Sequence, residues 1–337
     1  MRRTASAGSG QVVATMALLA AAPLACGGSA TETDLGGSGA AGAAAGAGFG
    51  AAAGAAGSAG TAGAAGAAGA AGSAGAAGAA GAAGSAGAGG VILGDGGLPP
   101  DFTPADLGGW RLGPRVPPDH GIDGGSLDRC GSILLGIVRD FQDTHPDFEH
   151  YCCGGLKGIV GPDLGADLKP VYASSGGTTY STGPNEFNQW YRDVDGVNMA
   201  YFLYLFFQQN GPVYTFASSA FFPLDGTGFG NQGRNHDFHF TTEIHTEFKY
   251  NGGETFTFTG DDDVFAYVNR KLAIDLGGVH PAESEQIDLD AKAQELGIQK
   301  GNVYPFDLFH AERHTTESNF RVDTDFDFTS CGIIPIR

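Results

Sequence analysis

Basic side chains are scarce in this sequence. Its 337 residues contain 18 Lys and Arg against 37 Asp and Glu, so the formal net charge is -19. No Lys or Arg lies between Arg3 and Arg111. Binding to nucleic acid requires a basic surface that neutralises phosphates, and this composition excludes nucleic acid as a partner. An acidic surface remains compatible with cations and with neutral ligands such as sugars.

The motifs that mark common enzyme classes are also missing. The sequence has no Gly-x-Ser-x-Gly elbow, no His-Glu-x-x-His pair and no phosphate-binding loop. Carboxylates are plentiful, but no pair of them is marked as the acid and nucleophile of a glycosidase. We therefore expect a protein that is not an enzyme.

The N-terminal residues predict export. Arg2 and Arg3 precede an apolar run at 12–22 that is too short to span a membrane. Residues 1–25 are thus predicted to be a signal peptide. A small residue followed by Cys26 resembles the cleavage site of bacterial lipoproteins, in which that cysteine carries the lipid. This implies a location at the outer surface of the cell envelope, with the lipid anchor as the sole membrane contact; secretion is the alternative.

Two linkers are expected before the folded domain. Residues 26–100 consist mainly of Ala, Gly and Ser, and Gly recurs at every third position over much of this length. The repeat lacks the proline of collagen, so a disordered, flexible tether is predicted. Residues 101–129, rich in Pro and Gly, are predicted to be a second linker. The folded domain is then expected at 130–337.

A two-residue period marks the clearest strand, at 236–250. Phe240, Ile244 and Phe248 fall on even positions, which predicts one buried face. With Gly-rich turns and little helix, the pattern predicts an all-β fold, an antiparallel sandwich or barrel. A short helix is expected within 183–192. The other expected strands are 132–141, 199–207, 213–217, 255–259, 264–268, 272–276, 302–309 and 319–328.

Three consecutive acids, Asp261, Asp262 and Asp263, follow the strand at 255–259. Adjacent carboxylates repel one another unless solvent or a cation screens them. Ca²⁺ prefers oxygen ligands from carboxylates and carbonyls, and a turn could bring two of these side chains to one ion. From residue chemistry alone, a calcium site and a solvated acidic turn both remain open.

Histidines and cysteines give weaker signals. His236, His239 and His245 are interpreted as ordinary strand positions, whereas His280 and His310 lie near glycine corners and could line the acidic end of the domain. Glu312-Arg313-His314 resembles an internal salt bridge more than a catalytic group.

The four cysteines after Cys26 predict disulfides in an exported chain. A Cys130–Cys331 bond would join the two ends of the domain. Adjacent cysteines rarely bond each other, so the competing pairing sends Cys152 and Cys153 separately to Cys130 and Cys331.

Several long motifs, in a fixed order, resemble the fibro-slime domain family. That family is similar to the protective-antigen-type β-sandwich domain of yeast flocculins and bacterial surface proteins. The motifs lie at 140–149, 187–194, 221–226, 238–245, 260–280 and 309–320. The resemblance implies an antiparallel β-sandwich or barrel of the protective-antigen type over about residues 130–330.

The resemblance also implies a site. In the sugar-binding members, two adjacent Asp residues joined by a cis peptide hold a Ca²⁺ that chelates sugar hydroxyls. Asp261 and Asp262 match that pair, and Asp263, which stands where those members commonly have Gly, is expected to be a supporting ligand. His280 and Asn319 are further candidate ligand-binding residues.

The expected function is a Ca²⁺-dependent module, anchored at the cell surface, that binds carbohydrate or extracellular matrix and serves adhesion. Its partner would be an extracellular polysaccharide or glycan. Two alternatives remain open at this point. One is a structural matrix (slime) protein without a sugar site, and the other is a carbohydrate-active hydrolase.

Overall fold

Antiparallel strands dominate the residues that the computed structural model describes, which are 107–116, 122–123 and 132–334. The predicted signal peptide (1–25), Cys26, the tether (26–100) and Cys130 lie outside these residues. Within the described part of the chain, no helix is long and apolar enough to cross a membrane.

The larger sheet has eight strands in the order β1-β5-β3-β8-β14-β10-β11, with β16 paired to β8. Every neighbouring pair is antiparallel. The strands are β1 (Trp110–Arg115), β3 (Ile133–Phe141), β5 (Asn198–Phe206), β8 (Phe240–Lys249), β10 (Asp263–Val268), β11 (Lys271–Leu276), β14 (Val303–Glu312) and β16 (Asp327–Phe328).

The smaller sheet has five strands in the order β13-β9-β15-β7-β6, also antiparallel. Two short ladders, β12–β4 and β17–β2, lie outside both sheets. These strands are β2 (Ile122–Asp123), β4 (Gly154–Gly155), β6 (Gln208–Asn210), β7 (Val213–Ser218), β9 (Thr255–Gly260), β12 (Gly278–Val279), β13 (Glu283–Asp288), β15 (Phe320–Thr324) and β17 (Ile333–Ile334).

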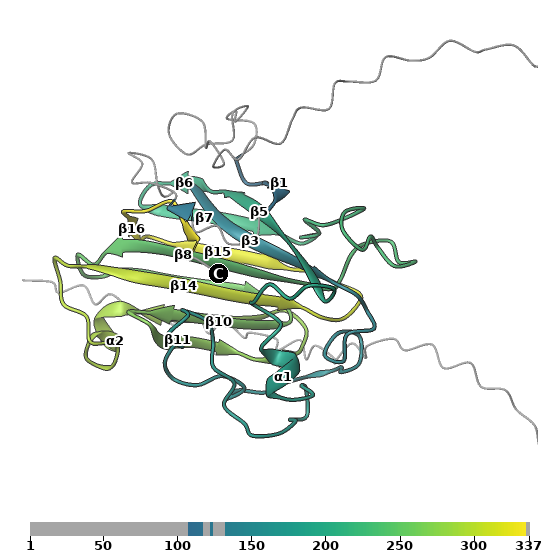
Figure 1. Cartoon of the computed structure of the whole chain (residues 1–337). Coiled ribbons are helices and arrows are strands. Elements are labelled where there is room, and N and C mark those ends of the chain that lie inside the picture. Colours follow the sequence, from purple (N-terminus) through teal and green to yellow (C-terminus); the bar gives the residue numbers. More distant parts are fainter. Residues whose placement is uncertain (1–106, 117–121, 124–131, 335–337) are drawn as a thin grey trace, which may run out of the picture. The chain divides into compact units, whose positions relative to one another are not determined.

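The main core lies between the two sheets (Figure 1). The even side chains of β8, including Phe240 and Ile244, meet Phe258 of β9 and Phe320 of β15 in one buried cluster. Alternate side chains point to opposite faces of a strand, so the two-residue period places this whole set on the inner face. The predicted all-β antiparallel sandwich is confirmed.

The outer face of the larger sheet is also covered, by the segment 142–197 that carries the short helix α1 (Pro184–Phe187) (Figure 1). Tyr191 packs edge-on against Phe309 of β14, with ring centroids 5.0 Å apart. The prediction of one buried face for β8 is therefore wrong, because both faces are buried. Glu243 on the odd face is held by Arg139 and Lys169, and His245 lies between Glu243 and Asp307.

Two segments differ from the sequence-based expectation. β1 lies within residues 101–129 and pairs with β5, so the folded domain begins before residue 130 and that segment is not all linker. β13 and helix α2 (Leu289–Leu296) were not expected. The helix is capped at its N-terminus by Asp288, whose side chain accepts from Ala291 N, and at its C-terminus by Gly297 in the left-handed conformation.

Candidate functional site

The three consecutive acids form the corner where the chain passes from one sheet to the other. β9 ends at Gly260 and β10 begins at Asp263. Asp261 and Asp262 are each 4% exposed and Asp263 is fully buried. A solvated acidic turn is therefore wrong as an account of this run. Buried carboxylates require hydrogen-bond donors or cations, and the three acids find different ones.

Asp261 is held by Asn319. The Asn319 backbone N–H donates to Asp261 Oδ1 at 2.5 Å, and its side-chain Nδ2 donates to Oδ2 at 3.0 Å. Gly260 permits this approach, because a Cβ there would lie 2.3 Å from the Asn319 carbonyl oxygen. Burial raises the pKa of Asp261, and the bonds from Asn319 oppose that rise. The structure thus brings together two of the residues expected at the site.

Asp263 faces the other way, toward Arg313. Arg313 Nε donates to Asp263 Oδ2 at 2.6 Å, and Gly278 N donates to Oδ1 at 2.7 Å. The Arg313 guanidinium is itself fully buried and lies 4.6 Å from the centre of the Trp190 ring. Both Asp263 oxygens are thus committed to protein donors, which makes this residue an internal counter-ion. The salt bridge expected within Glu312-Arg313-His314 is wrong in its partner: Arg313 pairs with Asp263, and Glu312 forms no described ion pair.

Among the buried acids at this corner, Asp262 and Glu312 accept no hydrogen bond from a described side chain. Asp262 Oδ2 accepts from Arg313 N at 2.9 Å. Glu312, at the end of β14, is fully buried, and neither of its carboxylate oxygens has a hydrogen-bond partner. Burial raises the pKa of Glu312 well above its ordinary value, and the nearby charges of Asp262 and Asp261 raise it further, while the Ser318 hydroxyl and the His314 N–H act against this rise. Burial likewise raises the pKa of Asp262.

We call Asp261, Asp262, Glu312 and Asn319 the acid corner. Sequence reasoning missed Glu312, which was taken as part of a salt bridge. The available signal was an acid placed at the end of a mostly apolar strand that pairs with β10.

The two histidines nearest the corner contact backbone carbonyls. His310 Nε2 lies 2.9 Å from Asp261 O and donates to it, while Nδ1 has no partner. Burial lowers the pKa of His310 to about 4, so the ring is neutral at neutral pH. His280 is buried, with its ring nitrogens 2.9 Å from Pro281 O and 3.3 Å from Leu276 O. No described hydrogen bond joins His280 to the acid corner, and its role as a ligand residue stays a prediction.

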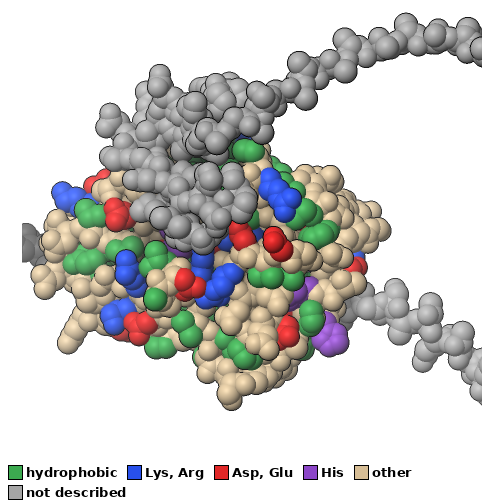
Figure 2. Space-filling view, in the orientation of Figure 1, with side chains coloured by type: hydrophobic (Ala, Val, Ile, Leu, Met, Phe, Trp, Pro, Cys, Tyr) green, Lys and Arg blue, Asp and Glu red, His purple; other side chains and the backbone are tan. Residues whose placement is uncertain are grey.

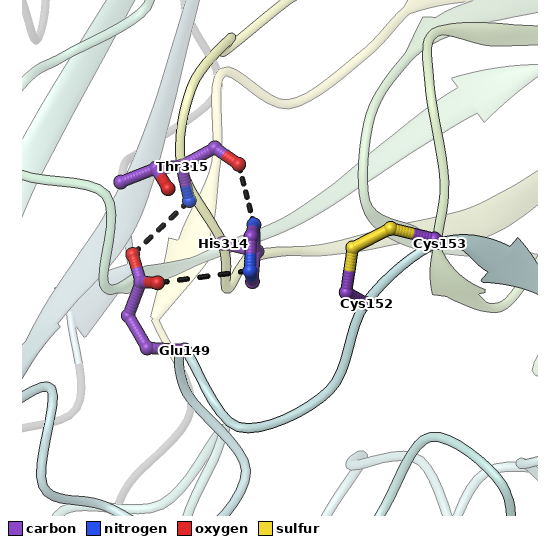
Figure 3. Close-up of a disulfide and its surroundings, with 5 residues drawn as sticks. All are labelled: Glu149, Cys152, Cys153, His314 and Thr315. Atoms are coloured by element: carbon purple, nitrogen blue, oxygen red, sulfur yellow. Dashed lines mark hydrogen bonds and ion pairs between the residues drawn. A yellow bond between two sulfur atoms is a disulfide. The ribbon is translucent and has the colours of Figure 1, made fainter. Parts of the chain in front are cut away.

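Glu149 fastens the loop that follows Arg313 (Figure 3). Its Oε1 accepts from Thr315 N at 3.1 Å, and its Oε2 lies 3.7 Å from His314 Nε2. Burial acts to raise the pKa of Glu149, but the contacts with His239, His314 and Thr315 outweigh it and the pKa is lowered.

The nearby cysteines form a disulfide with each other, Cys152–Cys153 (Figure 3). The prediction that these neighbours pair separately with Cys130 and Cys331 is therefore wrong. The backbone turns between them, with Cys153 at φ 80°, and this brings the two side chains together. Cys331 is disulfide-bonded, and the Cys130–Cys331 bond stays a prediction because Cys130 lies outside the described residues.

Whether a cation fits the acid corner depends on which ligand atoms the corner offers. Every group offered is oxygen, as Ca²⁺ prefers, and the two Glu312 oxygens accept from no donor. Within the described residues, no three His, Cys, Asp or Glu side chains already surround one point in metal-binding geometry. The peptide between Asp261 and Asp262 is trans, since the cis peptide of the described residues joins Thr315 and Thr316. The cis geometry implied by the resemblance is absent here.

Part of this chain matches a known domain family. Residues 224–335 match the family model of the PA14 domain. The chain is 39% identical over 225 residues to protein psiQ of Dictyostelium discoideum and 38% identical over 223 residues to its protein psiD. These alignments cover 61% and 60% of this chain but 22% and 44% of the relatives. The chain thus spans less than half the length of these curated relatives.

A solved structure described as the PA14 sugar-binding domain from RTX adhesin is similar over 60% of this chain and 99% of its own, with 8% identity and a TM-score of 0.26. The matched PA14 segment contains the whole acid corner, from Asp261 to Asn319.

Proposed function

We propose that this domain binds extracellular carbohydrate through a Ca²⁺ ion held at the acid corner. The observation that carries the proposal is Glu312, which is fully buried beside Asp261 and Asp262 with both carboxylate oxygens unpartnered. Leaving several carboxylates buried without a cation is costly, and a divalent ion removes that cost. The PA14 match over these residues, and the sugar-binding description of one similar domain, support the same function.

Each residue of the acid corner has a distinct task in this proposal. Asn319 orients the Asp261 carboxylate through two hydrogen bonds, and the Arg313 backbone orients Asp262. Carboxylate oxygens can accept more than one partner, so these bonds leave capacity for an ion. Bound Ca²⁺ supplies positive charge and coordination positions that sugar hydroxyls can fill. Asp263 holds Arg313 in place and is not among the proposed ligands, unlike in the sequence-based expectation.

Exposed residues close to Asn319 in the chain lie in the loop that follows Arg313. Asp261 and Asp262 keep a small exposed area, Asn319 is half-buried, and Thr316 and Glu317 beside it are exposed. The loop 314–319 is therefore the part of the surface that would contact a glycan.

A glycan array tests the proposal. The full chain is applied in Ca²⁺ and in chelator, together with Asp262→Asn and a control, Asp195→Asn, whose side chain is exposed and distant in sequence. We expect binding in Ca²⁺ by the wild type and the control, and none in chelator or by Asp262→Asn. Stabilisation by Ca²⁺ with no glycan bound would favour the matrix alternative. Turnover of a polysaccharide would favour the hydrolase.

We further propose that the domain serves adhesion at the outer surface of the cell envelope, anchored through a lipid on Cys26 and spaced from the membrane by residues 26–100. The sequence pattern before Cys26 supports this. Replacement of Cys26 by Ala should release the protein from the membrane fraction. If the Ala variant remains with the membranes, the lipid anchor is wrong.

A further inference from the structure

A pair of buried carboxyl groups lies outside the acid corner. Asp140 belongs to β3 and Asp237 precedes β8, and neither residue has exposed surface. One oxygen of each accepts from a backbone N–H: Phe229 N donates to Asp140 Oδ2 at 2.5 Å, and His239 N donates to Asp237 Oδ1 at 3.0 Å. The remaining oxygens, Asp140 Oδ1 and Asp237 Oδ2, have no hydrogen-bond donor.

No basic side chain of the described residues neutralises this pair. Arg139, next to Asp140 in sequence, pairs with Glu243 and Asp193 on the other face of the sheet. The Asp225 carboxylate accepts from Asp237 N and pairs with His236, so it adds negative charge. The remaining charged neighbours are also paired, His239 with Glu149, and Arg234 with Asp143 and Glu149.

Two buried carboxylates side by side cannot both be ionised at a low energetic cost. The two side chains interact directly with each other. Burial raises the pKa of Asp140 to about 7. Burial and the charge of Asp140 raise the pKa of Asp237 to about 8. A proton between the two unpartnered oxygens gives each of them a hydrogen bond.

The pair joins β3 to a glycine-rich loop, residues 221–239, that connects β7 to β8. Gly228 in this loop packs directly on Asp140, because a Cβ there would lie 1.8 Å from Asp140 Oδ2, and its φ is +61°. A side chain at 228 is thus excluded by both space and backbone conformation. Gln232 adds a further link, with Nε2 donating to Phe141 O at 3.0 Å. The Asp140 carboxyl therefore contacts the loop directly, at Gly228 and at Phe229 N.

We propose that Asp140 and Asp237 share a proton at neutral pH, and that this carboxyl–carboxylate hydrogen bond fastens the glycine-rich loop to β3 and makes it pH-sensitive. In the unfolded chain both groups ionise near their ordinary pKa of 3.8. The folded pair keeps its protons to higher pH. Its contribution to stability is thus complete below pH 3.8 and is lost as the pH rises toward 7 and 8. The proposal does not depend on the acid corner or its cation.

Carbon-13 NMR of the full chain, labelled at the Asp carboxyl carbons, tests for the shared proton directly. We expect two carboxyl signals with midpoints near 7 and 8, which Asp140→Asn and Asp237→Asn identify. Ionisation of every Asp carboxyl well below neutral pH would overturn the proposal. The titration is run in Ca²⁺ and in chelator. Midpoints that fall to acidic values in Ca²⁺ would show that a cation, not a proton, joins the pair.

Hydrogen exchange of the loop amides tests the consequence. After correction for intrinsic exchange, loop opening in the wild type should rise with pH, by roughly tenfold per pH unit for each proton released. Asp237→Asn removes one of the two titrating groups and offers an amide N–H to Asp140 at every pH, so opening in this variant should rise less steeply with pH. Asp195→Asn, at an exposed position outside the loop, is the control that should keep the wild-type slope. An unchanged slope in Asp237→Asn would contradict the proposal.

Discussion

Arg313 Nε donates to Asp263 Oδ2 at 2.6 Å, and neither side chain has any exposed surface. This pair divides the run of three acids into two parts with different tasks. Asp263 forms an ion pair with Arg313, whereas Asp262 accepts from the Arg313 backbone N–H and experiences the Arg313 charge without a described ion pair. Glu312 forms no described ion pair. The division explains how one short run can be both a structural anchor and a candidate cation site.

The buried Arg313–Asp263 pair should be necessary for folding stability. Replacement of Arg313 by Met leaves Asp263 buried without its cation, and we expect the free energy of unfolding to fall by about 3–5 kcal/mol. The exposed Arg321–Asp323 pair is the control, and Arg321→Met should cost about 0–1 kcal/mol. Urea denaturation measures both. The double variant Arg313→Met with Asp263→Leu should recover part of the loss, and equal losses at the buried and exposed pairs would contradict this account.

The contacts of Glu149 predict an acid-dependent loss of stability. Because its pKa is lowered below the ordinary 4.5, its contribution is present above that pH and is lost as the pH falls through the folded pKa. Glu149→Gln should lower the free energy of unfolding by about 1–2 kcal/mol at neutral pH. In acid, where the wild-type carboxyl is protonated, the difference should vanish. A difference that persists in acid would show that the ionised carboxylate is not the cause.

The Cys152–Cys153 disulfide should contribute little to global stability. A disulfide stabilises mainly by closing a loop of the unfolded chain, typically by about 2–4 kcal/mol. These residues are adjacent in sequence, so almost no loop is closed. The double variant with both cysteines replaced by Ser should unfold at nearly the wild-type urea concentration. Non-reducing peptide mapping checks the pairing, and a peptide that links Cys152 or Cys153 to Cys331 would refute it.

The sequence predicted the strands well where alternation was strong. Phe240, Ile244 and Phe248 recur at every second position, and the sandwich interior buries them as that period requires. The sequence-based prediction failed where contacts between residues distant in the chain determine burial and strand pairing. The odd face of β8 is polar in sequence, yet segment 142–197 covers it, and the buried charges on Glu243 and Arg139 neutralise each other. β1 was missed because Gly and Pro within 110–115 conceal its pairing with β5.

The candidate site shows the same limit. Asp261 and Asp262 were predicted because three adjacent acids are conspicuous, and Asn319 was a further candidate that no family motif identified as a ligand. The task of Asp263 depends on Arg313, which lies 50 residues later in the chain. No local pattern reveals that pairing. Glu312 was missed for the same reason, because its burial beside Asp261 and Asp262 is a property of the folded structure alone.

The central claim, a Ca²⁺ ion at the acid corner, is tested most directly by thermal unfolding of the full chain in Ca²⁺ and in chelator. The wild type and Asp195→Asn should be stabilised by about 2.7 kcal/mol when Ca²⁺ is present at about a hundred times its dissociation constant. Asp262→Asn and Glu312→Gln should lose most of this gain. Equal unfolding temperatures of the wild type in Ca²⁺ and in chelator would contradict the claim.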